Sequence, residues 1–256
     1  MAARADQASR IGATRVLVLL PTRELCVQVF SVFKKLSADI DNCEVACAAG
    51  GLDLQQQTAA LRRDPDILVA TPGRLIDHLH NTPNFSLRDL EILVLDEADR
   101  MLDEFFASQM KEILAQTGAE RQTLLFSATM SEKVRDLVAV SLKNPVKIFI
   151  SSNTDVAQGL EQQFVRIREG REGDREAIVA ALLTRYFPKY TLLFTQTKRL
   201  AHRMHIVLGL IGLKVAELHG SLSQTQRLES LAAFKSGQTD ILICTDVAAR
   251  GLDIPR

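Results

Sequence analysis

The chain has 256 residues, enough for one large domain or two of ordinary size, and hydrophobic residues make up 46% of it. Its 31 Lys and Arg residues balance 31 Asp and Glu residues, which argues against a nonspecific polyanion binder but leaves room for local basic patches. No run approaches the roughly 20 apolar residues of a membrane span. We therefore expect a soluble, intracellular, monomeric protein without a membrane partner.

Short apolar runs recur along the chain, and helical patterns lie between them. Continuous rather than alternating apolarity predicts strands that are buried on both faces. The runs are at 15–21, 45–51, 66–72, 91–97, 122–129, 189–197, 213–220 and 240–246. Helices are predicted at 23–37, 53–63, 131–142, 174–186, 198–211 and 223–235. The alternation predicts an α/β protein with right-handed crossovers and parallel sheets.

A polar, irregular stretch at 146–174 interrupts this alternation. We interpret 152–158 as a linker, and we predict that the segment LEQQFVRI at 160–167 is a strand that opens a second α/β unit. The chain is thus predicted to hold two domains of similar design, over 13–151 and 159–256.

Four cysteines, Cys26, Cys43, Cys47 and Cys244, show no paired CxxC spacing. Cys43 and Cys47 have the spacing of half a metal site, but no second half follows. Buried thiols in a reducing compartment are the better interpretation.

Asp96, Glu97 and Asp99 follow the apolar run 92–95 directly. Negative charges at the C-terminal end of a buried strand raise the free energy of the folded chain unless a positive charge lies opposite them. A strand that ends in Asp-Glu is typical of a Walker B element, in which Asp holds Mg²⁺ through water and Glu activates the attacking water. The dipeptide alone is weak evidence, because many such pairs are ordinary strand ends.

Other polar groups follow the remaining strands. In α/β proteins the catalytic and ligand-binding residues lie at these carboxyl ends of the strands. Each segment also has a plain structural explanation. Thr71 to Arg74 could be a turn with Pro72 in the first helical turn. Ser127 and Thr129 could cap the helix at 131–142, and Arg23 and Glu24 could form a solvated pair. His78 with His80, and His202 with His205, have no acidic ligand in pattern.

These structural explanations account for each segment alone but not for all of them together. Unrelated turns and helix caps would not produce eight motifs in this order along the chain. The motifs are PTRELCVQ (21–28), GG (50–51), TPGRL (71–75), LDEADRML (95–102), SAT (127–129), LLFTQTK (192–198), HGSLSQTQR (219–227) and TDVAARGLDIP (245–255). Together they resemble the DEAD-box RNA helicases, ATP-dependent enzymes with two RecA-like domains. GRLIDHLHN, SSNTDVA and REGDREAIVAALLTR are most similar to the nucleolar branch that acts in large ribosomal subunit assembly.

The resemblance implies a role for individual residues. Asp96 would hold Mg²⁺ through water, Glu97 would be the general base, and Asp253 would contact the ATP ribose. Asp99 would hydrogen-bond to Ser127 or Thr129 and couple nucleotide state to domain closure. RNA would be held by its sugar-phosphate backbone, independently of sequence. The residues implied in this contact are Pro21, Thr22, Arg23, Gly51, Thr71 and Arg74, and then Thr195, Gln224, Arg227, Thr245 and Gly251.

Two parts of the family pattern are not found in the sequence. The phosphate loop GxxxxGK[ST] is missing, since the chain contains no Gly-Lys pair, and the motif expected after Pro255 is absent. We therefore expect both domains to be incomplete, the strand near 122–129 to have an exposed apolar edge, and the chain alone to be an inactive fragment. The alternative hypothesis is a noncatalytic module that binds RNA or a partner.

Overall fold

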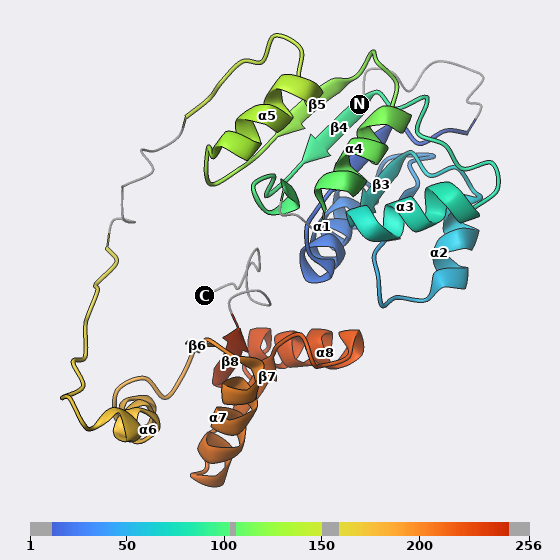
Figure 1. Cartoon of the computed structure of the whole chain (residues 1–256). Coiled ribbons are helices and arrows are strands. Elements are labelled where there is room, and N and C mark those ends of the chain that lie inside the picture. Colours follow the sequence, from blue (N-terminus) through green and yellow to red (C-terminus); the bar gives the residue numbers. More distant parts are fainter. Residues whose placement is uncertain (1–11, 103–105, 150–158, 246–256) are drawn as a thin grey trace. The chain divides into compact units, whose positions relative to one another are not determined.

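The computed structural model describes residues 12–102, 106–149 and 159–245. The chain divides into two compact units, Met1–Asp155 (unit 1) and Val156–Arg256 (unit 2). Figure 1 shows the helices and strands of each unit. Within the described ranges, none of the helices combines the length and apolarity that a membrane crossing requires.

Unit 1 is built on a parallel sheet of five strands in the order β2-β3-β1-β4-β5. The strands are β1 (Val16–Leu19), β2 (Val45–Ala48), β3 (Ile67–Ala70), β4 (Ile92–Leu95) and β5 (Gln122–Leu125). Each lies inside an apolar run predicted from the sequence. The parallel pairing is also as predicted, since every neighbouring pair of strands runs in the same direction.

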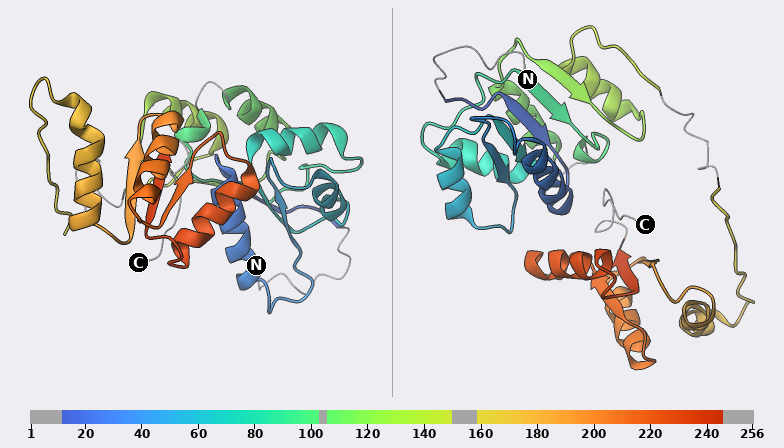
Figure 2. Two further views of the ribbon diagram at one scale, coloured as in Figure 1. Left: turned by 90° about the horizontal axis from the view of Figure 1, so that it is seen from below. Right: turned by 180° about the vertical axis from the view of Figure 1, so that it is seen from behind.

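Helices cover both faces of this sheet, as the two views of Figure 2 show. One face packs against α1 (Arg23–Leu36), through side chains that include Leu25 and Cys26. The other face packs against four helices: α2 (Leu54–Leu61), α3 (Pro72–Asn81), α4 (Ala107–Gln116) and α5 (Glu132–Ser141). A short 3₁₀ helix, Arg100–Leu102, follows β4.

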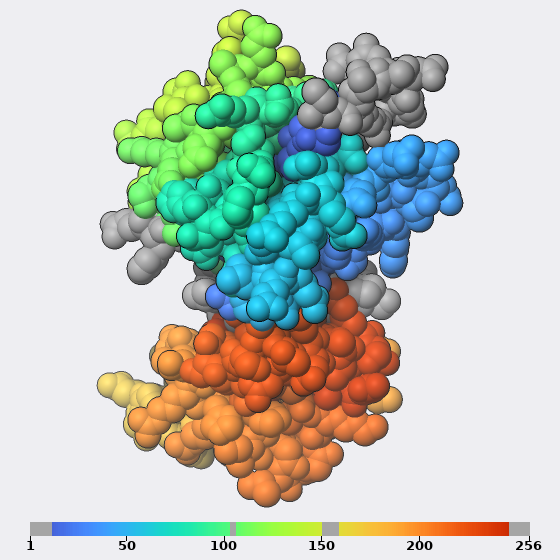
Figure 3. Space-filling view, turned by 90° about the vertical axis from the view of Figure 1, so that its right-hand side faces the viewer, coloured from blue at the N-terminus to red at the C-terminus, as the bar shows by residue number. Residues whose placement is uncertain are grey.

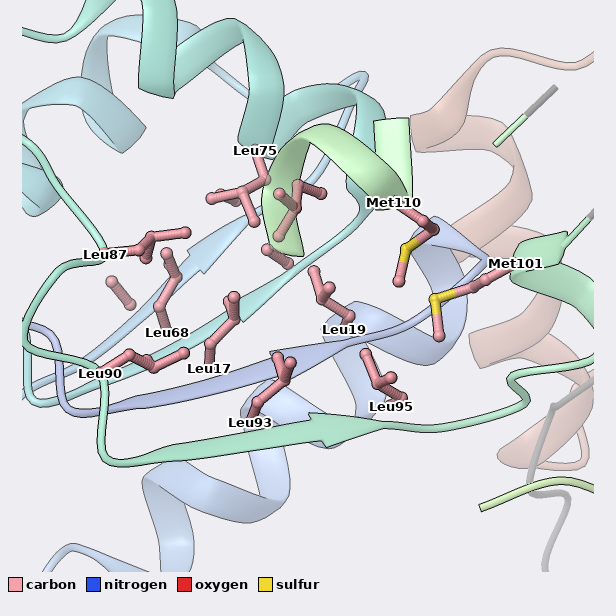
Figure 4. Packing of buried hydrophobic residues seen from close by; sticks show 14 of the residues in the cluster. Leu17, Leu19, Leu68, Leu75, Leu87, Leu90, Leu93, Leu95, Met101 and Met110 are labelled. Carbon is pink, nitrogen blue, oxygen red and sulfur yellow. The ribbon is translucent and has the colours of Figure 1, made fainter. Parts of the chain in front are cut away.

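The core of unit 1 explains why its strands have continuous apolar sequences. Leu17 and Leu19 of β1 point to the same side as Leu93 and Leu95 of β4 and meet Met101 and Met110 (Figure 4). Val16 and Val18 belong to the cluster on the α1 side. Alternate residues of one strand thus enter two different cores, so neither face can be polar.

Unit 2 has a parallel sheet of three strands in the order β6-β8-β7. The strands are β6 (Thr191–Thr195), β7 (Val215–Leu218) and β8 (Ile241–Thr245). One face packs on α8 (Gln224–Lys235), and the other packs on α6 (Arg175–Arg185) and α7 (Lys198–Leu210). A 3₁₀ turn, Glu172–Asp174, precedes α6. The central strand β8 is buried from Ile241 to Cys244.

The outer strands of the two sheets keep part of their apolar surface exposed. Beside β5, the side chain of Phe126 is 55% exposed, and on β6 that of Phe194 is 54% exposed. The exposed apolar edge expected near 122–129 is therefore present in the described part of the chain.

The strand predicted at 160–167 does not form. These residues have no regular secondary structure, and Phe164 and Val165 are exposed. A strand is stabilised by a partner that takes up its backbone hydrogen bonds, and the described part of unit 2 supplies none to this segment. Its β-branched and aromatic residues suggested a strand, but propensity alone does not make one.

The helix starts follow familiar capping chemistry. Thr22 caps α1 by accepting a hydrogen bond from Leu25 N, and Pro72 occupies the first turn of α3. Ser223 and Gln226 form a reciprocal capping box at α8. Ser131 caps α5, so the alternative that Ser127 or Thr129 caps this helix is wrong.

Candidate functional site

Five loops of unit 1 meet at the carboxyl edge of its sheet because the strands end in register. Leu19 pairs with Ala70 and with Leu95, Ala48 pairs with Ala70, and Leu95 pairs with Leu125. Neighbouring strands are about 4.8 Å apart. The segments that begin at Leu20, Ala49, Thr71, Asp96 and Phe126 therefore form one continuous row, and this row carries every site residue predicted in unit 1.

The acidic loop after β4 lies near the middle of this row. Asp96 N donates to Leu19 O at 3.1 Å, and Asp96 Oδ1 accepts from Glu97 N at 2.9 Å. Glu97 has a φ of 49°, which is uncommon for a residue other than glycine. Its carboxylate contacts the Arg100 guanidinium, with Oε2 at 3.3 Å from Nη1. The loop is thus held by its own hydrogen bonds and by one ion pair.

A side-chain hydrogen bond joins this loop to the loop after β5. Thr129 Oγ1 donates to Asp99 Oδ2 at 2.9 Å, which is one of the two contacts expected from the sequence. Ser127 Oγ donates to the Thr129 carbonyl at 2.7 Å, so Ser127 supports the loop of Thr129 and does not donate to Asp99. Two loops that are 30 residues apart in sequence are linked here.

The donor set of the acidic loop suits a hard divalent cation. Asp96, Glu97 and Asp99 offer only carboxylate oxygens, and all three residues are partly buried. Mg²⁺ takes one or two carboxylates and keeps several waters, so a sparse and half-open group of this kind fits it. Asp96 has one oxygen engaged by Glu97 N, and its second oxygen can face a water of the ion's shell.

Arg23 packs against the loop after β2. The Arg23 guanidinium lies within about 3.0 to 3.1 Å of the place where a side chain would begin at Gly50. Gly51 has a φ of 77°, so a side chain there would be strained. Glu24 is buried, with 3% exposure, so the alternative of a solvated Arg23–Glu24 pair is wrong. Arg23 itself is exposed and can meet a ligand.

The segment after β3 combines a buried hydroxyl with a partly buried arginine. Thr71 is 7% exposed and precedes α3, and its side chain makes no capping hydrogen bond. Arg74 Nε is buried and has no hydrogen-bond partner among the described residues. An orphaned guanidinium nitrogen of this kind is a donor that a phosphate oxygen could satisfy.

Unit 2 also places its predicted residues at the carboxyl edge of a sheet. Thr195 pairs with Thr245 across β6 and β8, and Leu218 pairs with Cys244, which puts His219 beside Thr245. Thr195 Oγ1 lies 3.3 Å from Thr197 O and 3.4 Å from Cys244 O. These hydroxyls are neutral groups, in contrast to the carboxylates of unit 1.

Gln224 and Arg227 lie in the first turn of α8, which follows this edge. Gln224 is buried, with 7% exposure, and Arg227 is partly buried. The capping box at Ser223 fixes the start of the helix and hence the positions of both side chains. Gly251 and Asp253, the remaining predicted residues, lie outside the described residues.

Sequence reasoning missed several charged contacts. His80 Nε2 lies 2.5 Å from Glu112 Oε1, so this histidine has an acidic neighbour. Arg100 pairs with Glu97, and the i,i+3 spacing inside LDEADRML could have revealed it. Glu217 of β7 lies 3.0 Å from His202 Nδ1 and 3.4 Å from His219 Nε2, so His202 has an acidic neighbour in space although the sequence pattern around it shows none. Glu217 comes 15 residues after His202, and no local pattern shows this contact.

A separate hollow lies away from the row of loops. It has a volume of about 560 Å³ and is lined by residues that include Thr14, Arg62, Asp64 and Asp89. Thr14 precedes β1, which places the hollow at the amino edge of the sheet, opposite the candidate site. It contains none of the predicted site residues.

Comparison with protein families decides the relationship. The family model described as DEAD/DEAH box helicase matches residues 2–137, more than half of the chain. The chain belongs to the DEAD/DEAH box helicase family. The helicase conserved C-terminal domain matches residues 174–256. The two parallel sheets with flanking helices confirm the predicted α/β fold of two RecA-like domains.

Individual helicases of this family show the same relationship. A human protein described as probable ATP-dependent RNA helicase DDX27 is 67% identical over 241 residues, covering 94% of this chain and 31% of that protein. ATP-dependent RNA helicase DRS1 of Candida albicans is 51% identical over 245 residues, covering 95% of this chain and 40% of that protein. The chain thus spans about a third of the length of the curated relatives it matches.

Two solved helicase structures share the fold. Saccharomyces cerevisiae Dbp5 bound to RNA and ADP BeF₃ has a TM-score of 0.82 and 26% identity, covering 95% of this chain and 61% of that chain. The DEAD-box helicase Mss116 bound to ssRNA and UDP-BeF has a TM-score of 0.73 and 26% identity, covering 95% of this chain and 53% of that chain.

Proposed function

We propose that the chain is part of an ATP-dependent RNA helicase and carries its RNA-gripping and magnesium-holding residues. The observation that carries this proposal is the row of five loops at the carboxyl edge of the unit 1 sheet. Hydroxyls, two arginines (Arg23 and Arg74) and backbone amides follow β2, β3 and β1, and the site carboxylates follow β4. This segregation suits a phosphate backbone on one side and a hydrated cation on the other.

On the cation side, Asp96 would hold the water shell of Mg²⁺, and ATP bound with that ion would supply the phosphoanhydride to be hydrolysed. Glu97 would orient the attacking water and accept its proton. Arg100 Nη1 lies 3.3 Å from Glu97 Oε2 in the structure, which leaves the second carboxylate oxygen, Oε1, to contact a water. The hydrogen bond between Asp99 and Thr129 would couple the nucleotide state at the acidic loop to the position of the loop after β5.

On the RNA side, the contacts would be to phosphates and 2′-hydroxyls. The start of α1 presents Thr22 and Arg23, and Gly51 allows a close approach to the backbone. Thr71 and Arg74 extend this surface along the start of α3. Such contacts carry no base sequence but select RNA over DNA through the 2′-hydroxyl. Oriented amides and a few arginines explain how a chain of zero net charge can bind RNA.

Unit 2 would add neutral donors to the same nucleic acid. Thr195, Gln224 and Thr245 are the described neutral residues in this role, and Arg227 would add a charged donor. Gly251 would also contact the RNA backbone, whereas Asp253 would contact the ATP ribose. The domain assignment we propose has 13–151 and 159–256 as the two RecA-like domains and 152–158 as their linker. The resemblance to the nucleolar branch supports a nuclear, nucleolar protein that acts on pre-ribosomal RNA.

Binding of the chain to fluorescently labelled single strands tests the RNA proposal. We expect the affinity for RNA to exceed that for DNA of the same sequence, to be similar among RNA sequences, and to fall with salt. Equal affinity for RNA and DNA would overturn the assignment of 2′-hydroxyl contacts.

Thermal unfolding with Mg²⁺ and ATP tests the cation side separately, because a ligand of the native state raises its stability by mass action. Asp96→Asn should reduce any increase in melting temperature that Mg²⁺-ATP produces, whereas Asp39→Asn, an exposed control after α1, should not. An unchanged increase in the Asp96→Asn variant would contradict the role of Asp96.

A further inference from the structure

Two cysteines of unit 1 face each other between α1 and β2. Cys26 Sγ of α1 and Cys47 Sγ of β2 are 3.6 Å apart, although 21 residues separate them in sequence. Cys26 is fully buried, and Cys47 is partly exposed. The sulfurs are in van der Waals contact, so only a modest movement separates them from the disulfide distance of about 2.0 Å.

We propose that Cys26 and Cys47 form a peroxide-sensitive dithiol, in which Cys47 is the oxidised thiol and Cys26 resolves it as a disulfide that joins α1 to β2. Cys26 lies within the motif PTRELCVQ (21–28), and Cys47 lies outside the eight motifs. Neither thiol is among the residues proposed to contact RNA or Mg²⁺. The sequence spacing did not reveal it, because the partner of Cys47 comes from a helix that the fold lays against the strand.

The environment of the two sulfurs assigns these different roles. Cys26 donates a hydrogen bond that stabilises negative charge on Cys47, and this lowers the pKa of Cys47. The same hydrogen bond, then burial and the charge of Cys47, raise the pKa of Cys26 well above its ordinary value. The thiolate is the nucleophile toward peroxide, and solvent reaches Cys47 but not Cys26.

The reaction balances with one peroxide. The Cys47 thiolate attacks a peroxide oxygen, the O–O bond breaks, and the hydroxide that leaves takes up the proton that Cys47 had released. The Cys26 sulfur then attacks the Cys47 sulfenic acid, the S–O bond breaks, and the oxygen leaves as water with the proton of Cys26. Two thiols and one peroxide thus give one disulfide and two waters.

The fold allows the movement that this bond needs. Among the described strands, β2 is an edge strand that pairs with β3 alone, so no described strand holds its other side. Cys47 is the third of the four residues of β2. A small shift of this strand end brings its sulfur toward α1 without breaking the central pairs of β1.

Peroxide treatment of the folded chain, followed by peptide mapping, tests the proposal. We expect a Cys26–Cys47 disulfide that dithiothreitol reverses, and an oxidised chain that melts at a higher temperature than the reduced one. Cys43→Ser and Cys244→Ser should keep the disulfide. Recovery of Cys26 and Cys47 as free thiols, or a disulfide between Cys43 and Cys47, would overturn the proposal.

Two variants separate the roles of the sulfurs. In Cys26→Ser the resolving thiol is gone, so Cys47 sulfenic acid should persist and react with dimedone. In Cys47→Ser the buried Cys26 should give no dimedone adduct. An adduct on Cys26 in the second variant would contradict the assigned order. Mapping of the wild-type chain needs neither variant, so a folding defect in either of them leaves the main test intact.

Discussion

The two units of the chain share one design but differ in what they place at the carboxyl ends of their strands. Unit 1 ends its strands in carboxylates and an arginine-bearing helix start, whereas the described strands of unit 2 end in Thr195, Thr245 and His219. Both sheets are parallel with helices on both faces, so packing alone does not require the difference. The comparison teaches that the two units differ in the loops that follow their strands rather than in the packing of their sheets, and for this reason we propose the Mg²⁺ site in unit 1.

The sheets also differ in how fully they are covered. Leu19 of β1 is completely buried, because β1 has neighbours on both sides and helices on both faces. Leu192 of β6 is 38% exposed, because within the described part of unit 2 β6 is an outer strand with β8 as its single neighbour. A core substitution and an edge substitution should therefore have very different costs.

The largest expected effect comes from this difference in coverage. Leu19→Ala should lower the free energy of unfolding by about 2 to 5 kcal/mol, because it leaves a cavity among packed leucines. Leu192→Ala should cost less than about 1 kcal/mol, because much of its surface already meets water. Urea unfolding followed by circular dichroism measures both. Equal costs would contradict the difference in coverage between the two strands.

The next largest effect concerns Arg23 at the start of α1, which is proposed to contact an RNA phosphate. Arg23→Ala should weaken RNA binding and reduce the slope of log affinity against log salt by about one unit, because one phosphate contact is lost. Arg62→Ala is the matched control, since Arg62 is also exposed but lines the hollow at the opposite edge. Titrations at several salt concentrations measure the slope. A slope that changes equally in both variants would show that only net charge matters.

A smaller effect is the pH dependence of stability at His78. Burial, and then the positive charge of Arg74, lower the pKa of His78 below its ordinary value. His78 is hydrogen-bonded to Thr82 at 2.9 Å and to Gln57 at 3.3 Å, and the second contact joins α3 to α2. The space-filling view of Figure 3 shows this part of unit 1 in cyan to blue-green colours. Below the ordinary pKa the unfolded chain binds more protons than the folded chain, so stability should fall as the pH is lowered through it.

His78→Gln should flatten this dependence, because glutamine does not titrate. His80→Gln is the control, since His80 is an exposed residue of the same helix. Urea unfolding between neutral and mildly acidic pH measures the slope. If the free energy of unfolding still depends on pH to the same extent in His78→Gln, the dependence arises from another titrating group.

The smallest effect is the coupling between Asp99 and Thr129. A double-mutant cycle with Asp99→Asn and Thr129→Val should give a coupling energy of about 0.5 to 1.5 kcal/mol, since one hydrogen bond to a carboxylate is lost. Urea unfolding of the four proteins measures it. Additive effects would show that the two loops are not linked.

Much of the fold could be predicted because parallel strands are buried on both faces and have continuous apolar sequences. All eight strands that the structure describes lie inside predicted runs. For α3 the sequence offered only the alternative of a helix start with Pro72 in its first turn, which the structure confirms, and no range was predicted for α3 or α4. The strand at 160–167 was predicted wrongly, because a strand depends on a partner that local sequence does not reveal.

The site was predictable only where its parts are local in sequence. Asp96 and Glu97 follow one strand directly, so their motif shows them together. The contacts of Asp99 with Thr129, of Glu217 with His202 and of Cys26 with Cys47 join distant segments. The family resemblance suggested the first of these, and none follows from spacing, because the order of strands in the sheet decides which loops meet.

Photo-crosslinking of single-stranded RNA to the chain, with mapping of the linked peptides, tests the central claim most directly. We predict crosslinks in the loops at the carboxyl edges of the two sheets, at 21–23, 50–51 and 71–74 in unit 1 and at 195 and 224–227 in unit 2. Crosslinks concentrated at the amino edge of the unit 1 sheet, around Thr14, Arg62 and Asp89, would contradict it.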